Sequence, residues 1–288
     1  MEKYCSKCGS LLIDDRCPVC GHKEVSKKPK KSQMIWFIAL AVILGLSILA
    51  NSPMRDSMEY FLLDRFYYSS LDVVTTIDDN HYDNVQYALP ATGDDVDITL
   101  CAGNYVVGED IPEGVYKIVN KKGFGAIWID DMKNDIYINE SLNPESEGTD
   151  EYFSCYLDNV RLYNGANINV YTNAMQFISS NGQTDTMGKR MENPLTTSYT
   201  IDGKTQSATL IGDEIPAGTY DIIAVSGSGL VESENWTNGI HATLTVDENE
   251  RYDVVRYNNV VLNEDEKLDV DEGLTIELVP SATMIEGE

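Results

Sequence analysis

The sequence predicts a mainly β protein in which an N-terminal zinc ribbon and one transmembrane helix precede two tandem β-sandwich-like modules. Three observations lead to this prediction. Four cysteines form two C-x-x-C-G knuckles, an uncharged apolar run follows them, and the remaining chain repeats itself in short segments of alternating polarity. Paired cysteines, a long apolar run and period-two alternation indicate three different kinds of structure.

The first element is a zinc ribbon over residues 1–24. Its predicted ligands are Cys5, Cys8, Cys17 and Cys20. Four thiolates suit a structural, tetrahedral Zn²⁺ site, and about twenty residues bury too little apolar surface to fold without the metal. A redox C-x-x-C pair or disulfides are the alternatives, and two matching knuckles in a reducing compartment favour zinc. His22 is an alternative ligand, but four cysteines already complete the site.

The segment from Cys5 to His22 resembles the short zinc ribbons that precede a single membrane span in many bacterial proteins, especially those of Gram-positive bacteria. The resemblance implies a structural or docking element without chemistry of its own.

A basic linker over residues 25–33 leads into a transmembrane helix over residues 34–52. Residues 34–50 carry no charge, and a helix of this length, rising about 1.5 Å per residue, approaches the thickness of the bilayer core. Lysines crowd its N-terminal side, so the N-terminus is expected in the cytoplasm and the C-terminus outside the cell membrane. A cleaved signal peptide is the alternative, and the long apolar run and the cysteine-rich head favour a retained anchor.

The charge of the chain divides at the same place. Residues 1–33 hold eight Lys or Arg and four Asp or Glu, whereas residues 51–288 hold thirteen and forty-three. The outer part therefore carries a formal charge of −30 and the head +4. This disfavours nucleic acid as a partner of the ectodomain and favours contact between the basic stretch and anionic lipid.

Residues 53–95 are expected to form a stalk and linker. Apolar side chains recur at helical spacing within residues 56–78, which predicts a short amphipathic helix with Asp56 as its N-cap. Residues 79–95 are expected to be a linker.

The outer part contains an internal repeat. The segment YVVGEDIPEGVYKI (105–118) recurs as TLIGDEIPAGTYDI (209–222), and EYFSCYLDNVRL (151–162) recurs as RYDVVRYNNVVL (251–262). A final, weaker match pairs GANINV (165–170) with GLTIEL (273–278). Such self-similarity indicates two copies of one domain. We expect module 1 at 96–172, a connector at 173–203 and module 2 at 204–288.

Short alternating runs rich in Val, Ile, Tyr and Thr predict strands in both copies. In the shared signature, Ile-Pro-x-Gly is typical of a tight turn. The side chains that follow it are expected in the core, and an aromatic ligand platform is the alternative for the tyrosines. These residues are Tyr116, Ile118, Tyr220 and Ile222.

The signature is similar to the "VGxDIPxGxYxI" modules that recur in exported and membrane-anchored proteins of Gram-positive bacteria. The resemblance covers about 75 residues in each copy. It implies an extracytoplasmic β module that serves as a binding or spacing unit, and it names no ligand.

The sequence shows no nucleophile elbow, phosphate loop or H-E-x-x-H motif, so we expect no enzyme.

The pairs Gly123–Gly125 and Gly227–Gly229 are interpreted as a hairpin or bulge, not as a nucleotide loop. Acidic clusters within 130–135 and 263–271 are expected to be solvated hairpin tips, with Ca²⁺ as the less favoured alternative.

The cysteines of the outer part, Cys101 and Cys155, leave two alternatives open: a disulfide across module 1, or two buried thiols. Of the histidines, His81 is expected in a linker and His241 in a strand, and neither belongs to a catalytic motif.

These observations predict a non-enzymatic cell-envelope membrane protein that binds, senses or scaffolds an extracytoplasmic ligand or protein. The alternative is a membrane-tethered regulator whose zinc-ribbon head contacts nucleic acid or a cytosolic protein factor. A third hypothesis, an envelope hydrolase, requires paired acids in a cleft.

Overall fold

The computed structural model describes residues 18–20 and 73–284, and the mainly β fold class is confirmed for the second range. This range belongs to a compact unit, Ser69–Glu288. The transmembrane helix predicted at 34–52 and most of the stalk lie outside the described residues. Within the described part, no helix is long and apolar enough to span a bilayer.

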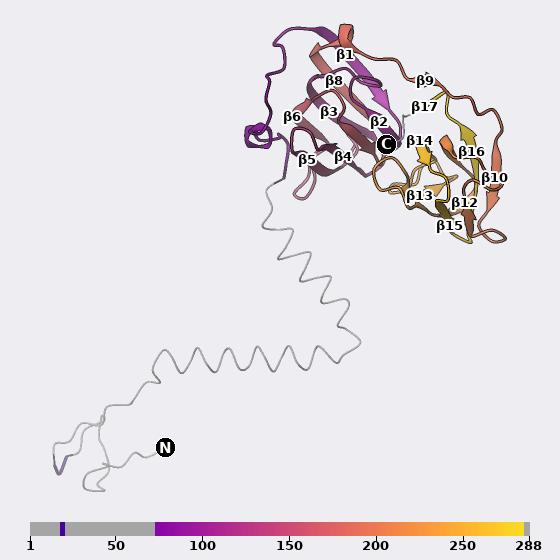
Figure 1. The fold of residues 1–288 in the computed structure, drawn as a ribbon. Helices are drawn as coiled ribbons and strands as arrows, with labels where there is room; N and C mark the ends of the chain where they lie inside the picture. The colour runs from indigo at the N-terminus through magenta and orange to yellow at the C-terminus, as the bar shows by residue number, and fades with distance from the viewer. Residues whose placement is uncertain (1–17, 21–72, 285–288) are drawn as a thin grey trace. The chain divides into compact units, whose positions relative to one another are not determined.

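Module 1 consists of two four-stranded antiparallel sheets that share one core (Figure 1). The strand orders are β1-β8-β3-β6 and β2-β7-β4-β5. The strands are β1 (Asp94–Leu100), β2 (Gly103–Val106), β3 (Gly114–Lys122), β4 (Gly125–Asp131), β5 (Ile136–Leu142), β6 (Tyr156–Leu162), β7 (Asn167–Val170) and β8 (Ala174–Gly182).

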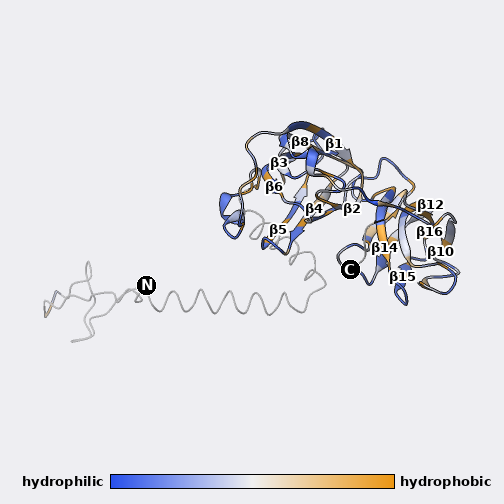
Figure 2. Ribbon diagram, turned by 45° about the horizontal axis from the view of Figure 1, so that its top comes forward, coloured by the Kyte–Doolittle hydropathy of each residue, from blue (hydrophilic) through white to orange (hydrophobic). Residues whose placement is uncertain are grey.

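Module 2 repeats this arrangement with sheets β10-β16-β12-β14 and β11-β15-β12-β13. Its strands are β10 (Tyr199–Asp202), β11 (Ala208–Leu210), β12 (Gly218–Ser233), β13 (His241–Thr245), β14 (Arg256–Leu262), β15 (Lys267–Val270) and β16 (Leu274–Pro280). The long β12 takes the place of both β3 and β4. In Figure 2 apolar residues fall on strands such as β14, and many connecting segments are hydrophilic.

The register confirms the internal repeat. Gly114 lies opposite Leu162 in module 1, and Gly218 lies opposite Leu262 in module 2. The pair β3–β6 of module 1 and the pair β12–β14 of module 2 both have a bulge directly after the signature tyrosine. The weaker sequence match was wrong, because β7 corresponds to β15 (267–270) and the strand at 274–280 corresponds to β8.

The glycine pairs mark the place where the chain passes from one sheet to the other. Gly123, with φ of +82°, separates β3 from β4, and Gly227, with φ of +78°, lies within the continuous β12. A side chain is strained at such φ values. Register shifts lie just before both glycines, between Asn120 and Lys122 and between Ala224 and Ser226, as a bulge requires. The alternative of a hairpin was wrong, because the chain continues forward into the second sheet.

The turn of the signature lies earlier than we predicted. The chain turns at 108–110, where the N–H of Gly108 donates to the Ile111 carbonyl, and Pro112 enters the next strand through a bend. The expected core residues are confirmed, since Tyr116, Ile118, Tyr220 and Ile222 are all buried.

The boundaries of module 1 extend beyond those predicted. Residues 73–78, the described end of the helix predicted at 56–78, are not helical, and Ile77 packs in the module core. Tyr82, in the 3-10 helix η2 (Asp79–Tyr82), packs in the same core, so the expected linker is attached to the fold. At the other end, β8 buries Met175 and Phe177 in the core, so the first part of the connector predicted at 173–203 belongs to module 1. Residues 183–198 form the segment between the modules, with η3 (Thr184–Thr186) and β9 (Met191–Glu192), which pairs with β17 (Thr283–Met284).

Candidate binding site at the module junction

The predicted zinc site lies mostly outside the described residues. Cys5, Cys8 and Cys17 are not described, and Cys20 is exposed in the short range 18–20. Within the described ranges, no group of three or more His, Cys, Asp or Glu side chains is placed to hold a metal ion. The zinc ribbon therefore stays a prediction.

The first acidic cluster is part of a hairpin between β4 and β5. Asp131 and Asn134 are buried, and Asn134 donates both its backbone N–H and its Nδ2 to the Asp131 carboxylate. Asp135 has a positive φ of 56°. These contacts close a tight turn, and the expectation of a fully solvated tip was wrong for the two buried residues.

In the second cluster, Glu266 has a structural role. Its side chain is buried and accepts hydrogen bonds from the backbone N–H groups of Asn235 and Asn263, both at 2.7 Å. A buried carboxylate of this kind needs such donors. Glu266 thereby holds the loop 234–240 between β12 and β13.

The two cysteines of module 1 form no disulfide in the structure. Cys101 is exposed and Cys155 is half-buried. Both alternatives from the sequence, a disulfide and a pair of buried thiols, are therefore wrong. His81 lies in η2, and His241 opens β13, where its Nδ1 is 2.7 Å from the carboxylate of Glu232.

The two modules meet at a junction built around Asn104 of β2, which is fully buried. Its Nδ2 donates to the carbonyls of Asn238, at 2.7 Å, and Gly239, at 2.8 Å. Its Oδ1 accepts from Asn169 Nδ2, at 2.7 Å, and from the Tyr257 hydroxyl, at 3.0 Å. One amide thus joins two strands of module 1 to a loop and a strand of module 2. Burial also raises the pKa of Tyr257 well above its ordinary value.

Backbone contacts extend the junction along β14. Asn258 forms a parallel bridge with Gly103, and its N–H donates to the Ala102 carbonyl at 2.9 Å. The side-chain Nδ2 of Asn173 donates a hydrogen bond to the Asp253 carbonyl, and its Oδ1 accepts one from the Val255 N–H. These contacts join the sheets of the two modules edge to edge.

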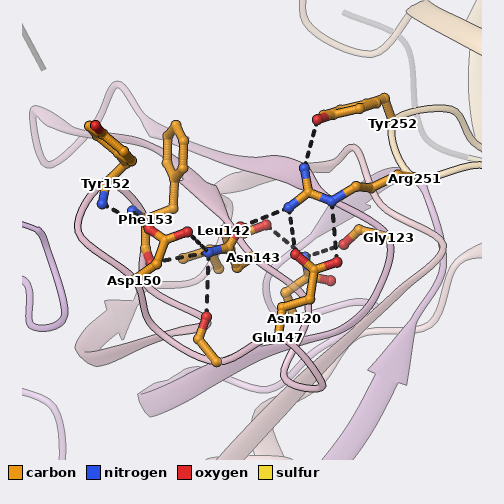
Figure 3. A network of polar contacts seen from close by, with 11 residues as sticks. Asn120, Gly123, Leu142, Asn143, Glu147, Asp150, Tyr152, Phe153, Arg251 and Tyr252 are labelled. Atoms are coloured by element: carbon orange, nitrogen blue, oxygen red, sulfur yellow. Dashed lines mark hydrogen bonds and ion pairs between the residues drawn. The ribbon is translucent and has the colours of Figure 1, made fainter. Parts of the chain in front are cut away.

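A second contact, the Arg251 clamp, closes one end of the junction (Figure 3). The guanidinium of Arg251 from module 2 donates two hydrogen bonds to Glu147 and one, at 3.2 Å, to Asn143 of module 1. The guanidinium carbon of Arg251 lies 5.2 Å from the ring centre of Phe124 and 5.0 Å from that of Tyr252. The bidentate bond lowers the pKa of Glu147 and raises that of Arg251.

The loop 234–240 reaches from module 2 onto module 1, and hydrogen bonds hold it at several points. Glu266 accepts a hydrogen bond from the backbone N–H of Asn235. The side-chain oxygen of Asn235 in turn accepts hydrogen bonds from the backbone N–H groups of Thr237 and Asn238, both at 3.1 Å. Asn104 holds the far side. The loop is therefore fixed, yet it leaves Trp236 78% exposed.

An aromatic pocket of about 180 Å³ lies against this loop, between the modules. Module 1 contributes Trp128 and Tyr171, whose rings are 5.5 Å apart, and module 2 contributes Trp236 stacked at 6.0 Å on His241. A fixed, exposed indole beside a lined cavity is typical of a binding site rather than a core. Both tryptophans among the described residues line this one pocket.

The same loop also lines an acidic groove of about 590 Å³, and this groove too takes its lining from both modules. Trp236 and Asn235 belong to the lining of both the pocket and the groove. The carboxylates that line the groove are Glu109, Glu234, Glu264, Asp265 and Glu266, and its lining includes no Lys or Arg.

The sequence interpretation missed this site. Trp128 and Trp236 lie 108 positions apart, and the repeat offset does not align them because they come from different parts of the two modules. A usable signal was the loop between β12 and β13, which is longer than its counterpart between β4 and β5 and carries a tryptophan.

Comparisons with known proteins give no assignment. No family model and no curated protein matches the chain. A solved structure described as "cAMP bound PfPKA-R (141-441)" is similar at 10% identity over 65% of this chain and 70% of that chain, with a TM-score of 0.18. So low a score assigns neither fold nor function.

Proposed function

We propose that the protein is a non-enzymatic, single-pass protein of the cell envelope whose two β modules bind an extracytoplasmic ligand or partner. In this proposal residues 34–52 anchor the chain and a cytosolic zinc ribbon forms the inner end. The observation that supports binding most strongly is Trp236, which a fixed loop holds exposed over a pocket formed by both modules.

The modules act together in this proposal. Neither module alone forms the pocket, because Trp128 and Tyr171 come from one and Trp236 and His241 from the other. The junction around Asn104 fixes these rings before any ligand arrives, and preorganisation lowers the entropic cost of binding.

The test is capture of envelope components by the purified full-length chain in neutral detergent, with and without calcium. We expect saturable capture that Trp236→Ala weakens about tenfold, as is typical of a central aromatic contact. Met132→Ala is the matched control, because Met132 is 72% exposed on the equivalent hairpin of module 1.

Equal capture by the parent chain and Trp236→Ala would contradict a binding role for the pocket. It would favour the alternative function, in which the zinc-ribbon head contacts nucleic acid or a cytosolic factor and the modules act as spacers.

A further inference from the structure

The aromatic pocket and the acidic groove share one loop, and together they restrict the chemistry of the ligand. We propose that this paired site binds a basic peptide segment of a partner protein. A lysine or arginine head group lies against the indole rings of the pocket, and the groove receives the neighbouring positive charges. This inference rests on the proposed binding function and adds the ligand class.

The first step is the aromatic pocket. Trp128, Tyr171 and Trp236 present indole and phenol rings to one cavity, and the lining of that cavity contains no Lys or Arg. The faces of such rings carry partial negative charge, so they attract ammonium and guanidinium groups, and tryptophan does so most strongly.

The second step is charge. Glu234, Glu264 and Asp265 line the groove, and within the described part of the chain none of the three forms an ion pair. Unpaired carboxylates in a concave surface create a negative potential that raises the local concentration of cations. The formal charge of −30 on residues 51–288 acts in the same direction.

Other ligand classes account for only half of these observations. A neutral glycan would use the rings and leave the carboxylates without a role. A calcium ion would use carboxylates, but within the described residues no group of three or more is placed to hold a metal. An anionic polymer would be repelled. A basic peptide uses both surfaces.

The third step is spacing. The linings of the pocket and the groove share Asn235 and Trp236, so the two cavities adjoin at the loop. A peptide that lies across this loop places one side chain in the pocket and its neighbours over the carboxylates. The corresponding hairpin of module 1, between Asp131 and Ile136, carries no aromatic residue. We therefore expect one site per chain.

The test uses a fluorescein-labelled tetralysine peptide and the full-length chain in neutral detergent, with binding followed by fluorescence anisotropy. We expect saturable binding that weakens in 0.5 M salt, because salt screens exposed charges. Trp236→Ala should weaken it about 5- to 20-fold and Trp236→Phe less, since the ring is retained.

The groove is tested by the pair Glu264→Gln and Asp265→Asn, which we expect to weaken binding about 3- to 10-fold. The matched control is Asp95→Asn with Glu151→Gln, two exposed acids of module 1 outside both cavities, which changes the net charge equally. This control and Met132→Ala should bind as the parent does. Thermal unfolding of each variant verifies the fold.

Three results would overturn the inference. If the control pair weakens binding as much as the groove pair, the attraction is only net charge. The second result concerns the ligand class, and it is measured in a Trp36→Phe chain, whose tryptophan fluorescence comes from Trp128 and Trp236 alone. In this chain neutral tetra-N-acetylglucosamine would change the fluorescence, Trp236→Ala would abolish that change, and tetralysine would not bind. The ligand class would then be wrong while the binding function stands. If neither probe binds, the basic-peptide inference fails, and if envelope capture is also insensitive to Trp236→Ala, the proposed binding function fails with it.

Discussion

The signature tyrosine combines two roles in one side chain. Tyr116 and Tyr220 fill the cores of the two modules, and each hydroxyl donates to the carbonyl of the proline four residues earlier, Pro112 at 2.6 Å and Pro216 at 2.8 Å. A buried hydroxyl without an acceptor would cost free energy. The spacing of proline and tyrosine in the signature therefore has a structural reason, which does not require a ligand.

We expect Tyr116→Phe to lower the free energy of unfolding by about 1 kcal/mol, because it removes one buried hydrogen bond and little volume. Tyr220→Phe should cost less, since its bond is only partly buried. Urea denaturation of both variants measures the difference. Tyr137→Phe, whose residue is exposed, is the control. Equal stabilities of the parent and Tyr116→Phe would show that the bond contributes nothing.

Asn104 shows what residue-level reading of a sequence misses. Asparagine is expected in turns and on surfaces, yet Asn104 is fully buried with partners in both modules. Those partners lie more than 60 positions away, so no local pattern indicates them. By contrast, the burial of Ile118 and Ile222 could be predicted, because alternation along a strand is local.

At the scale of elements, the strand that crosses between sheets differs in the two modules. The crossing at Gly123 separates two strands, while Gly227 lies within one unbroken strand. A Cβ at Gly227 would lie 1.9 Å from the Gly273 carbonyl oxygen, whereas at Gly123 the nearest atom is 3.3 Å away.

We therefore expect Gly227→Ala to destabilise the protein more than Gly123→Ala. Both variants carry the strain of a positive φ, about 1–2 kcal/mol, and only Gly227→Ala adds a backbone clash. Thermal unfolding of the two variants provides the measurement. The reverse order of melting temperatures would contradict this account of the crossing.

The Arg251 clamp makes stability depend on pH. The hydrogen bond from Arg251 lowers the pKa of Glu147 below its ordinary value of 4.5, and N–H groups of Phe153 and Tyr152 lower that of Asp150 below 3.8. A carboxyl group with a lowered folded-state pKa stabilises the fold above its unfolded-state pKa. That stabilisation is lost as the pH falls through the folded-state value.

We expect Glu147→Gln to lower the melting temperature at neutral pH, and the difference from the parent to shrink as the pH falls from about 5 to about 3. Comparison with the parent is needed because the other carboxylates titrate as well. Calorimetry of both proteins at a series of pH values measures this difference in melting temperature. A difference that does not change with pH would show that the Glu147 charge is unimportant.

For the molecule as a whole, the junction should make two modules unfold as one. Each module has its own core, but the Asn104 network, the Asn258 bridge and the Arg251 clamp join them. Cooperative unfolding requires that separating the modules cost free energy comparable to opening one of them.

The two modules should therefore give a single calorimetric transition in the parent chain. Asn104→Ala leaves several buried polar groups without partners, a loss of about 2–4 kcal/mol, and should split the transition in two. Asn167→Ala, in the lining of the groove, is the control. Two transitions already present in the parent would mean that the modules fold independently.

The mainly β fold and the duplication could be read from the sequence alone, because alternation, turn residues and repetition are local properties of a chain. The zinc ribbon and the membrane anchor rest on local patterns too, and they remain predictions. The tertiary structure decided the module boundaries, since the pairing of β8 with β1 and β3 places it in module 1 and not in the predicted connector. It also decided the site: Trp128 and Trp236 become neighbours of one pocket only because a buried asparagine network fixes one module against the other.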